Sequence, residues 1–200
     1  MEITGSAAPT RGYGVLEKYL ARRRANKVDR LIPADLRSGA ILDIGCGSYP
    51  YFLAQVKFSA KVGLDKSVSE GMIDGVSLKK YEFKTGDNLP VSPSCFNVVT
   101  MLAVLEHLDE TAALNILAQS YRALVPGGLL IVTTPWGKTK GLLSLLAAFK
   151  IVSPDEIGEH QQFYSRQELF KQFSATGFAA DKITGGSFEL GLNLYAIAKK

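Results

Sequence analysis

Short apolar runs alternate along the chain with segments whose apolar residues recur at helical spacing. The apolar runs predict seven strands, at 40–44, 61–64, 81–84, 96–102, 129–134, 178–183 and 192–198. Helical spacing predicts helices at 16–31, 49–57 and 110–124. S-x-x-E capping boxes at Ser153 and Ser165 mark two later helix starts, and the second of these helices ends near Gly177. Strands that alternate with helices are typical of a parallel sheet covered on both faces.

The length and composition fit one α/β domain. The chain has 200 residues, of which 46% are hydrophobic and 21% charged, so it can bury a sizeable core. We expect a single domain over 1–200, with a helical extension at 1–36 and an apolar insertion or lid at 136–160. The predicted fold is a doubly wound, mostly parallel seven-stranded sheet with a C-terminal antiparallel β-hairpin, whose strands are joined through G-G-S and G-L-N.

Charge and cysteine content narrow the setting. The 23 basic and 19 acidic residues give a formal charge of +4, which is weak evidence for a polyanionic partner. The R-R-R at 22–24 either meets a phosphate or sugar nucleotide or forms a solvated helix face. Cys46 and Cys95 form neither a C-x-x-C pair nor a zinc set, which fits reduced thiols and no metal site. The start lacks the features of a secretory signal and no apolar run could span a bilayer, so we expect a cytoplasmic protein.

The most informative stretch is I-L-D-I-G-C-G-S-Y-P at 41–50. Gly45 and Gly47 stand where a predicted strand meets a helix, and their missing side chains let backbone N–H groups approach a ligand. Pro50 takes the place of the third glycine of a dinucleotide-binding turn, so a pyrophosphate fits poorly. Asp43 adds a negative charge beside the turn, which favours a cationic or zwitterionic ligand.

Acidic residues recur after the next two predicted strands. Asp65 ends the second strand, where an acid can accept both hydroxyls of a ribose, and Asp87 follows the third. The carboxyl ends of parallel strands meet at one edge of a sheet, so Asp43, Asp65 and Asp87 are expected to line one ligand site. Any one of these acids could instead cap a helix or turn.

Five motifs, in this order, resemble those of class I S-adenosylmethionine-dependent methyltransferases, and most closely the small-molecule branch. They are I-L-D-I-G-C-G, V-G-L-D, G-D-N-L-P, C-F-N-V-V-T-M-L-A-V-L-E-H-L and L-V-P-G-G-L-L-I-V-T-T-P. The resemblance covers 41–135 closely and extends more loosely through E-H-Q-Q-F-Y-S-R-Q-E-L. It implies a Rossmann-like fold, methyl transfer as the activity and S-adenosylmethionine as the cofactor. Asn97 replaces an aspartate common in the family, at a position that usually supports the strand rather than the chemistry.

The resemblance also implies which residues hold the methionine and ribose parts of the cofactor. Gly45, Cys46 and Gly47 would contact the methionine part. Asp43 would lie near the sulfonium end, and Asp65 would bind the ribose.

The other implied contacts follow later strands. Asp87 would receive the adenine amino group, with Asn88 and Lys66 beside the ring. Met101 and Leu102, at the end of the fourth predicted strand, would line the methionine and methyl side. The cofactor would then lie across the carboxyl edge of the sheet.

The two histidines are candidates for handling a proton of the acceptor. Methyl transfer needs the acceptor atom in line with the methyl group and the sulfur, and it needs a base only if that atom must lose a proton. The hypothesis is that His107 or His160, with Glu106 or Tyr164 nearby, takes or orients this proton. Alternatively, His107 serves a helix start and His160 anchors a loop.

Missing motifs narrow the acceptor. No N-P-P-Y or D-P-P-Y follows the fourth predicted strand, and Cys95 lies before it, so nucleic-acid methylation is not expected. We expect a small acceptor, methylated on an oxygen or carbon of a saccharide, quinone-like or lipid-linked intermediate. The apolar segment 138–152 is a lid, an interface or a peripheral membrane contact, and the oligomeric state stays open. A non-catalytic binding or regulatory protein and an NAD-dependent oxidoreductase are the alternative interpretations.

Overall fold

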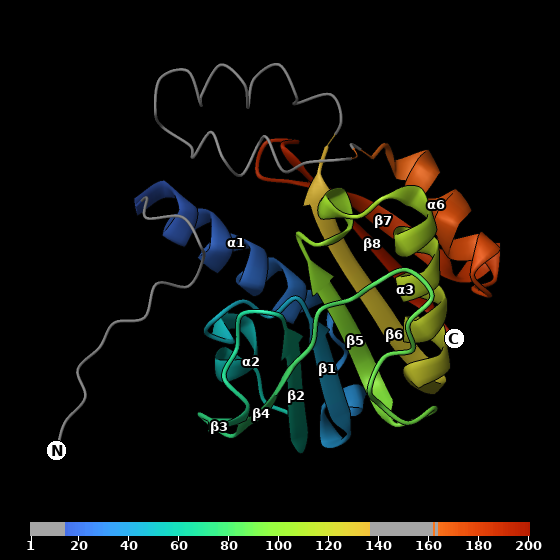
Figure 1. Cartoon of the computed structure of the whole chain (residues 1–200). Coiled ribbons are helices and arrows are strands. Elements are labelled where there is room, and N and C mark those ends of the chain that lie inside the picture. The colour runs from blue at the N-terminus through green and yellow to red at the C-terminus, as the bar shows by residue number, and fades with distance from the viewer. Residues whose placement is uncertain (1–14, 137–161, 163) are drawn as a thin grey trace, which may run out of the picture.

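An eight-stranded sheet forms the centre of the molecule (Figure 1). This computed structural model describes residues 15–136, 162 and 164–200. The strand order is β3-β4-β2-β1-β5-β6-β8-β7. The strands are β1 (Ala40–Ile44), β2 (Ala60–Asp65), β3 (Gly71–Ile73), β4 (Val76–Lys80), β5 (Phe96–Leu102), β6 (Leu124–Pro135), β7 (Ile183–Phe188) and β8 (Asn193–Lys199). Strands β4, β2, β1, β5 and β6 run parallel, whereas β3, β8 and β7 pair antiparallel with their neighbours.

Helices cover both faces of the sheet. They are α1 (Val15–Leu31), α2 (Tyr51–Gln55), α3 (Glu110–Ala123) and α6 (Arg166–Ala175), with the 3-10 turns η1 (Ala34–Ser38), η2 (Leu105–His107) and η4 (Ala180–Lys182). Helices α1 and α2 lie on one face, and α3 and α6 lie on the other (Figure 1). Neighbouring strand residues enter opposite cores: Ile41 packs with α1 and α2, and Leu42 packs with α3 and α6. The alternation explains why the central strands are apolar throughout.

The predicted fold class is confirmed. The sheet is doubly wound and mostly parallel, and its C-terminal strands β7 and β8 pair antiparallel. The two strands predicted at 40–44 and 96–102 have the predicted bounds. The capping box at Ser165 is also present: its hydroxyl accepts from the backbone N–H of Glu168, whose carboxylate accepts from the backbone N–H of Ser165.

The strand predicted at 81–84 is wrong. The third parallel strand is β4, and an extra antiparallel strand, β3, raises the count from seven to eight. In β4, Val76 and Leu78 are buried while the lysines at its end are exposed, so its apolar run is too short to stand out. Asp74 and Gly75, which join β3 to β4, both have positive φ, at 51° and 73°. A D-G pair between strands is the signal that identifies such a hairpin in a sequence.

The strand predicted at 178–183 is also wrong, because β7 begins where that segment was expected to end. The predicted G-G-S connection is part of β7 itself. A Cβ atom on Gly185 would lie 2.5 Å from the carbonyl oxygen of Tyr195, and one on Gly186 would lie 3.0 Å from the Tyr195 ring. The two glycines therefore allow close packing inside the strand rather than a turn. The helix predicted at 49–57 is shorter than expected and begins after Pro50 as its N-cap.

Asn97 supports the start of β1. Its side-chain oxygen accepts a hydrogen bond of 3.1 Å from the backbone N–H of Ala40. The side chain fills the space above Gly39, where a Cβ atom would collide with it. The departure from the aspartate of related sequences thus falls at a structural position far from the carboxyl edge of the sheet. The predicted insertion at 136–160, apart from Trp136, and the capping box at Ser153 lie outside the described residues.

Candidate active site

The glycine turn after β1 is fixed to the end of β2 by backbone hydrogen bonds. Gly45 and Gly47 have φ values of 78° and 76°, which favour glycine. The N–H groups of Gly45 and Cys46 donate to the Leu64 carbonyl at 2.8 and 3.2 Å. Cys46 is buried, and burial raises the pKa of its thiol. The turn therefore offers backbone and no reactive thiolate.

Asp65 holds two loops at the same edge. Its Oδ2 accepts from the N–H of Gly47 at 3.0 Å, and its Oδ1 accepts from the N–H of Ser67 at 2.7 Å. An ionised carboxylate has about four acceptor positions, so each oxygen of Asp65 keeps capacity for another donor. A pair of neighbouring hydroxyl groups, as on a ribose, suits this half-buried carboxylate.

Asp43 lies beneath the turn, where it is only 2% exposed. Burial raises the pKa of its carboxyl group to about 7; the hydrogen bond from Thr100 opposes this rise, and the charge of Asp65 adds to it. The Thr100 hydroxyl donates to Asp43 Oδ1 at 2.6 Å. A cationic ligand nearby would favour the ionised form of Asp43.

The glycine turn contacts the segment that follows β5. A Cβ atom on Gly45 would lie 2.4 Å from Cγ2 of Val104. Val104 directly precedes η2. The N–H of Ala103, a residue with φ of 59°, donates to the Thr133 carbonyl of β6 at 3.0 Å. The loops after β1, β5 and β6 are therefore held together at the carboxyl edge.

Glu106 is a fully buried carboxyl group at this edge, only 1% exposed. Burial raises the pKa of Glu106, and the nearby His107 and Arg24 oppose this rise only in part. Its Oε2 has no hydrogen-bond partner within the part of the chain that the structure describes, and the same is true of Thr134 Oγ1 at the end of β6. A buried polar atom without a partner costs free energy of folding, so such atoms indicate a place where a ligand binds.

The three predicted catalytic residues have different surroundings. His107 lies in η2 beside Glu106 and is half-buried. Tyr164 is buried, and its hydroxyl donates to the Leu105 carbonyl at 3.4 Å. Burial raises the pKa of Tyr164 to about 12, which favours a role in positioning η2 over one as a base. His160 lies outside the described residues.

The loop after β4 carries the residues expected beside an adenine ring. Asp87 is half-buried, its N–H donates to the Lys84 carbonyl at 3.0 Å, and its carbonyl accepts from Asn115 at 3.2 Å. The Tyr81 hydroxyl donates to the carbonyl of the exposed Asn88 at 3.1 Å. The backbone of this loop is thus fixed at both residues.

Two expected contacts lie deeper in the protein than the sequence predicted. Met101 is fully buried in the core between the sheet and α3, so only its backbone can face a ligand. Leu102 is half-buried and packs against the opposite core. Lys66 is exposed directly after Asp65. The structure therefore groups Asp43, the turn 45–47 and Asp65 closely, and it leaves Lys66 at the surface.

Several residues of the site gave no signal in the sequence. Thr100, Val104 and Thr134 lie in or next to apolar strands, where a hydroxyl or a valine fits an ordinary core. Arg24 lies within a basic helix face, yet its charge reaches both Glu106 and Glu189. Only Glu106 could have been identified, because it stands next to His107 after a buried strand.

Comparisons with known proteins agree with this geometry. A family model described as a methyltransferase domain matches residues 16–183. The ubiquinone biosynthesis O-methyltransferase of Colwellia psychrerythraea is 27% identical over 92% of this chain and 82% of its own length. The same-named protein of Aeromonas salmonicida is 25% identical over 77% of this chain and 71% of its own length. A structure from Thermotoga maritima, described as an S-adenosylmethionine-dependent methyltransferase and possible histamine N-methyltransferase, has 23% identity and a TM-score of 0.64, and the match covers 88% of this chain and 87% of that one.

The chain belongs to this methyltransferase-domain family and is a class I S-adenosylmethionine-dependent methyltransferase. S-adenosylmethionine is its cofactor. The described residues fit this cofactor: the glycine turn presents backbone N–H groups, Asp65 has acceptor capacity for ribose hydroxyls, and Asp43 offers negative charge to a cation. Among the described residues, no helix is long and apolar enough to cross a membrane.

Replacing Gly45 by alanine should destabilise the protein and weaken cofactor binding. The left-handed backbone costs a non-glycine residue about 1–2 kcal/mol, and the contact with Val104 adds to this cost. Urea unfolding and titration with S-adenosylhomocysteine would measure both effects. Gly75→Ala is the matched control, since Gly75 has φ of 73° and open space around its Cβ position. Equal losses of stability in the two variants would show that the contact with Val104 is unimportant.

The stability of the protein should depend on pH through Asp43. In the unfolded chain this carboxyl group loses its proton near its ordinary pKa of 3.8, whereas in the folded protein it keeps the proton until about pH 7. The free energy of unfolding of the wild type should therefore fall, relative to an Asp43→Asn variant, as the pH rises from 4 to 7. Urea unfolding of both proteins across this range measures the difference. A difference that stays constant with pH would contradict this assignment.

Proposed function

We propose that this methyltransferase methylates a hydroxyl oxygen of a small, quinol-like aromatic acceptor. The observation that carries the proposal is the buried carboxyl group of Glu106, whose Oε2 lacks a hydrogen-bond partner among the described residues. The curated relatives from Colwellia and Aeromonas are named for O-methylation in ubiquinone biosynthesis, which supports an acceptor of this kind.

Glu106 suits a hydroxyl acceptor because of its place and its acidity. Glu106 lies in η2, after β5, and Thr134 lies at the end of the adjacent strand β6. An acceptor hydroxyl between these strand ends can donate to Glu106 Oε2, and a second oxygen on the same ring can accept from the Thr134 hydroxyl. Two neighbouring oxygen atoms on one ring match this pair better than an amine or an isolated carbon would.

The chain contributes position and a proton acceptor. The bound cofactor supplies an electrophilic methyl group on a sulfonium centre. Glu106 orients the acceptor oxygen and takes its proton, which then passes to solvent. Burial raises the pKa of Glu106 towards the operating range of a general base, so the group accepts a proton more readily than an exposed carboxylate does. Thr134 holds the ring so that the oxygen reaches the methyl group in line.

The test is transfer of a labelled methyl group from S-adenosylmethionine to a panel of acceptors that includes a catechol, a hydroquinone and a simple saccharide. We expect turnover with the aromatic hydroxyls, and we expect Glu106→Gln to lower kcat by roughly 10²- to 10⁴-fold. Binding of S-adenosylhomocysteine should stay within about twofold of wild type, because Glu106 is not assigned to the cofactor.

Two controls make the result specific. Glu110→Gln removes an exposed carboxylate from the nearby start of α3 and should leave kcat unchanged. Asp65→Ala should abolish binding of S-adenosylhomocysteine and all turnover together. The pH dependence of kcat separates proton transfer from positioning, since its rising limb should disappear in Glu106→Gln. Full turnover by Glu106→Gln on an aromatic hydroxyl, or turnover confined to saccharides, would overturn the proposal.

A further inference from the structure

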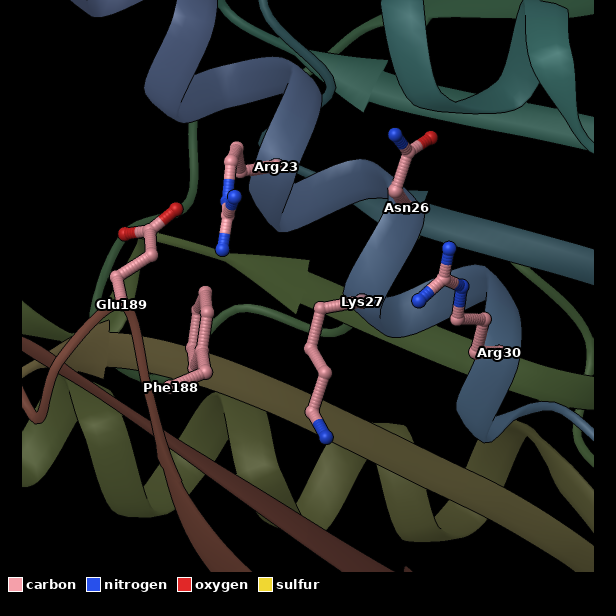
Figure 2. A pocket seen from close by; sticks show the side chains of 6 residues that line it. All are labelled: Arg23, Asn26, Lys27, Arg30, Phe188 and Glu189. Atoms are coloured by element: carbon pink, nitrogen blue, oxygen red, sulfur yellow. The ribbon is translucent and has the colours of Figure 1, made fainter.

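A pocket of about 220 Å³ lies between α1 and the end of β7 (Figure 2). Four of its residues come from one side of α1 and two come from β7 and the turn that follows it. The lining residues are Arg23, Asn26, Lys27, Arg30, Phe188 and Glu189. The turn lies at the carboxyl edge of the sheet, because β8 begins opposite the end of β6, where Asn193 pairs with Pro135.

The helix side of the pocket carries three positive charges. Arg23, Lys27 and Arg30 are spaced four and three residues apart, so they share one face of α1. None of them forms an ion pair within the part of the chain that the structure describes, in contrast to Arg37, which bonds to Asp29 at 2.8 Å. Arg23 donates to the Tyr19 hydroxyl at 3.2 Å, and the Lys27 ammonium lies 4.5 Å from the centre of the Tyr195 ring. The three cations are held next to one another without a neutralising partner.

The single acid of the lining is already engaged. Glu189 Oε2 accepts from the side-chain amide of Asn193 at 2.6 Å. Glu189 also lies near Arg24, on the inner side of the helix, and near Arg23. Three cations against one carboxylate leave an excess of at least two positive charges, before Arg24 is counted. An empty pocket with this excess repels itself and attracts a multiply charged anion.

We propose that this pocket binds the phosphate or diphosphate group of a small phosphorylated molecule. A phosphate monoester carries a charge of about −1.5 to −2 near neutral pH, which matches the excess. Guanidinium groups bind phosphate oxygens in pairs, and the amide of Asn26 adds a neutral donor. The volume equals that of roughly seven water molecules, at about 30 Å³ each, so it admits one or two phosphate groups. Half-buried Phe188 supplies an apolar wall for the attached organic part.

The inference goes beyond the proposed methyl transfer and does not depend on its acceptor. The pocket lies on the outer face of α1, and no residue assigned to the cofactor or to the methyl acceptor lines it. The basic run at 22–24 in the sequence left open whether these charges meet phosphate or only water. Arg23 and Arg30 enter the pocket lining, whereas Arg22 does not.

Isothermal titration of the full chain with inorganic pyrophosphate tests the site directly. We expect saturable binding to one site, weakened roughly tenfold or more in Arg30→Ala, which removes one charged donor. Arg22→Ala is the matched control, because it removes the same charge from an exposed neighbouring position of the same helix, and it should change the affinity less than about twofold. Glu189→Gln should tighten binding by removing the opposing carboxylate. Equal weakening by Arg22→Ala and Arg30→Ala would overturn the site in favour of diffuse attraction.

Two further arms separate other sources of the same signal. Titration in the presence of saturating S-adenosylhomocysteine should leave pyrophosphate binding unchanged; competition between them would place the anion in the glycine turn and overturn the proposal. Co-sedimentation with phosphatidylglycerol vesicles should show no loss specific to Arg30→Ala. Vesicle binding that depends on Arg30, without any pyrophosphate binding, would assign the pocket to a lipid surface and overturn the small-molecule ligand.

Discussion

The carboxylate of Asp65 fixes the geometry on which the rest of the active site depends. It joins the glycine turn after β1 to the loop after β2 through two backbone N–H groups, those of Gly47 and Ser67. Charge-assisted hydrogen bonds of this kind are stronger than neutral ones, and here they hold both loops without filling the acceptor capacity of either oxygen. The same group can therefore order the site before the cofactor arrives and bind the cofactor afterwards.

Parallel pairing then brings distant parts of the chain to that group. Ile44 is in register with Leu64 on one side and with Met101 on the other, so β1, β2 and β5 end together. The contact between Gly45 and Val104 connects the cofactor turn to η2, where Glu106 lies. Because η2 is placed by both the turn and Tyr164, the position of the carboxyl group of Glu106 depends on the packing of three separate segments.

The sequence predicts well where one physical signal dominates. Strands β1 and β5 are buried on both faces and bounded by polar or glycine residues, so their limits follow from apolar runs alone. Strand β4 alternates buried and partly exposed residues near the sheet edge, and β7 contains two glycines that serve packing, so neither resembles an apolar run. The turn 45–47 and Asp65 follow from strand-end logic. The burial of Glu106 does not, since glutamate is almost always exposed and its environment comes from tertiary packing.

Arg24 gives helix α1 an influence on the chemistry that its sequence does not suggest. Its charge lowers the pKa of Glu106 on one side and that of Glu189 on the other, against the upward effect of burial. If α1 moves away from the sheet, Glu106 loses this cation and becomes a stronger proton acceptor that is also more often already protonated. The N-terminal helix thus acts as a tuning element, and any event that shifts it adjusts the pH at which the buried carboxylate is ready to work.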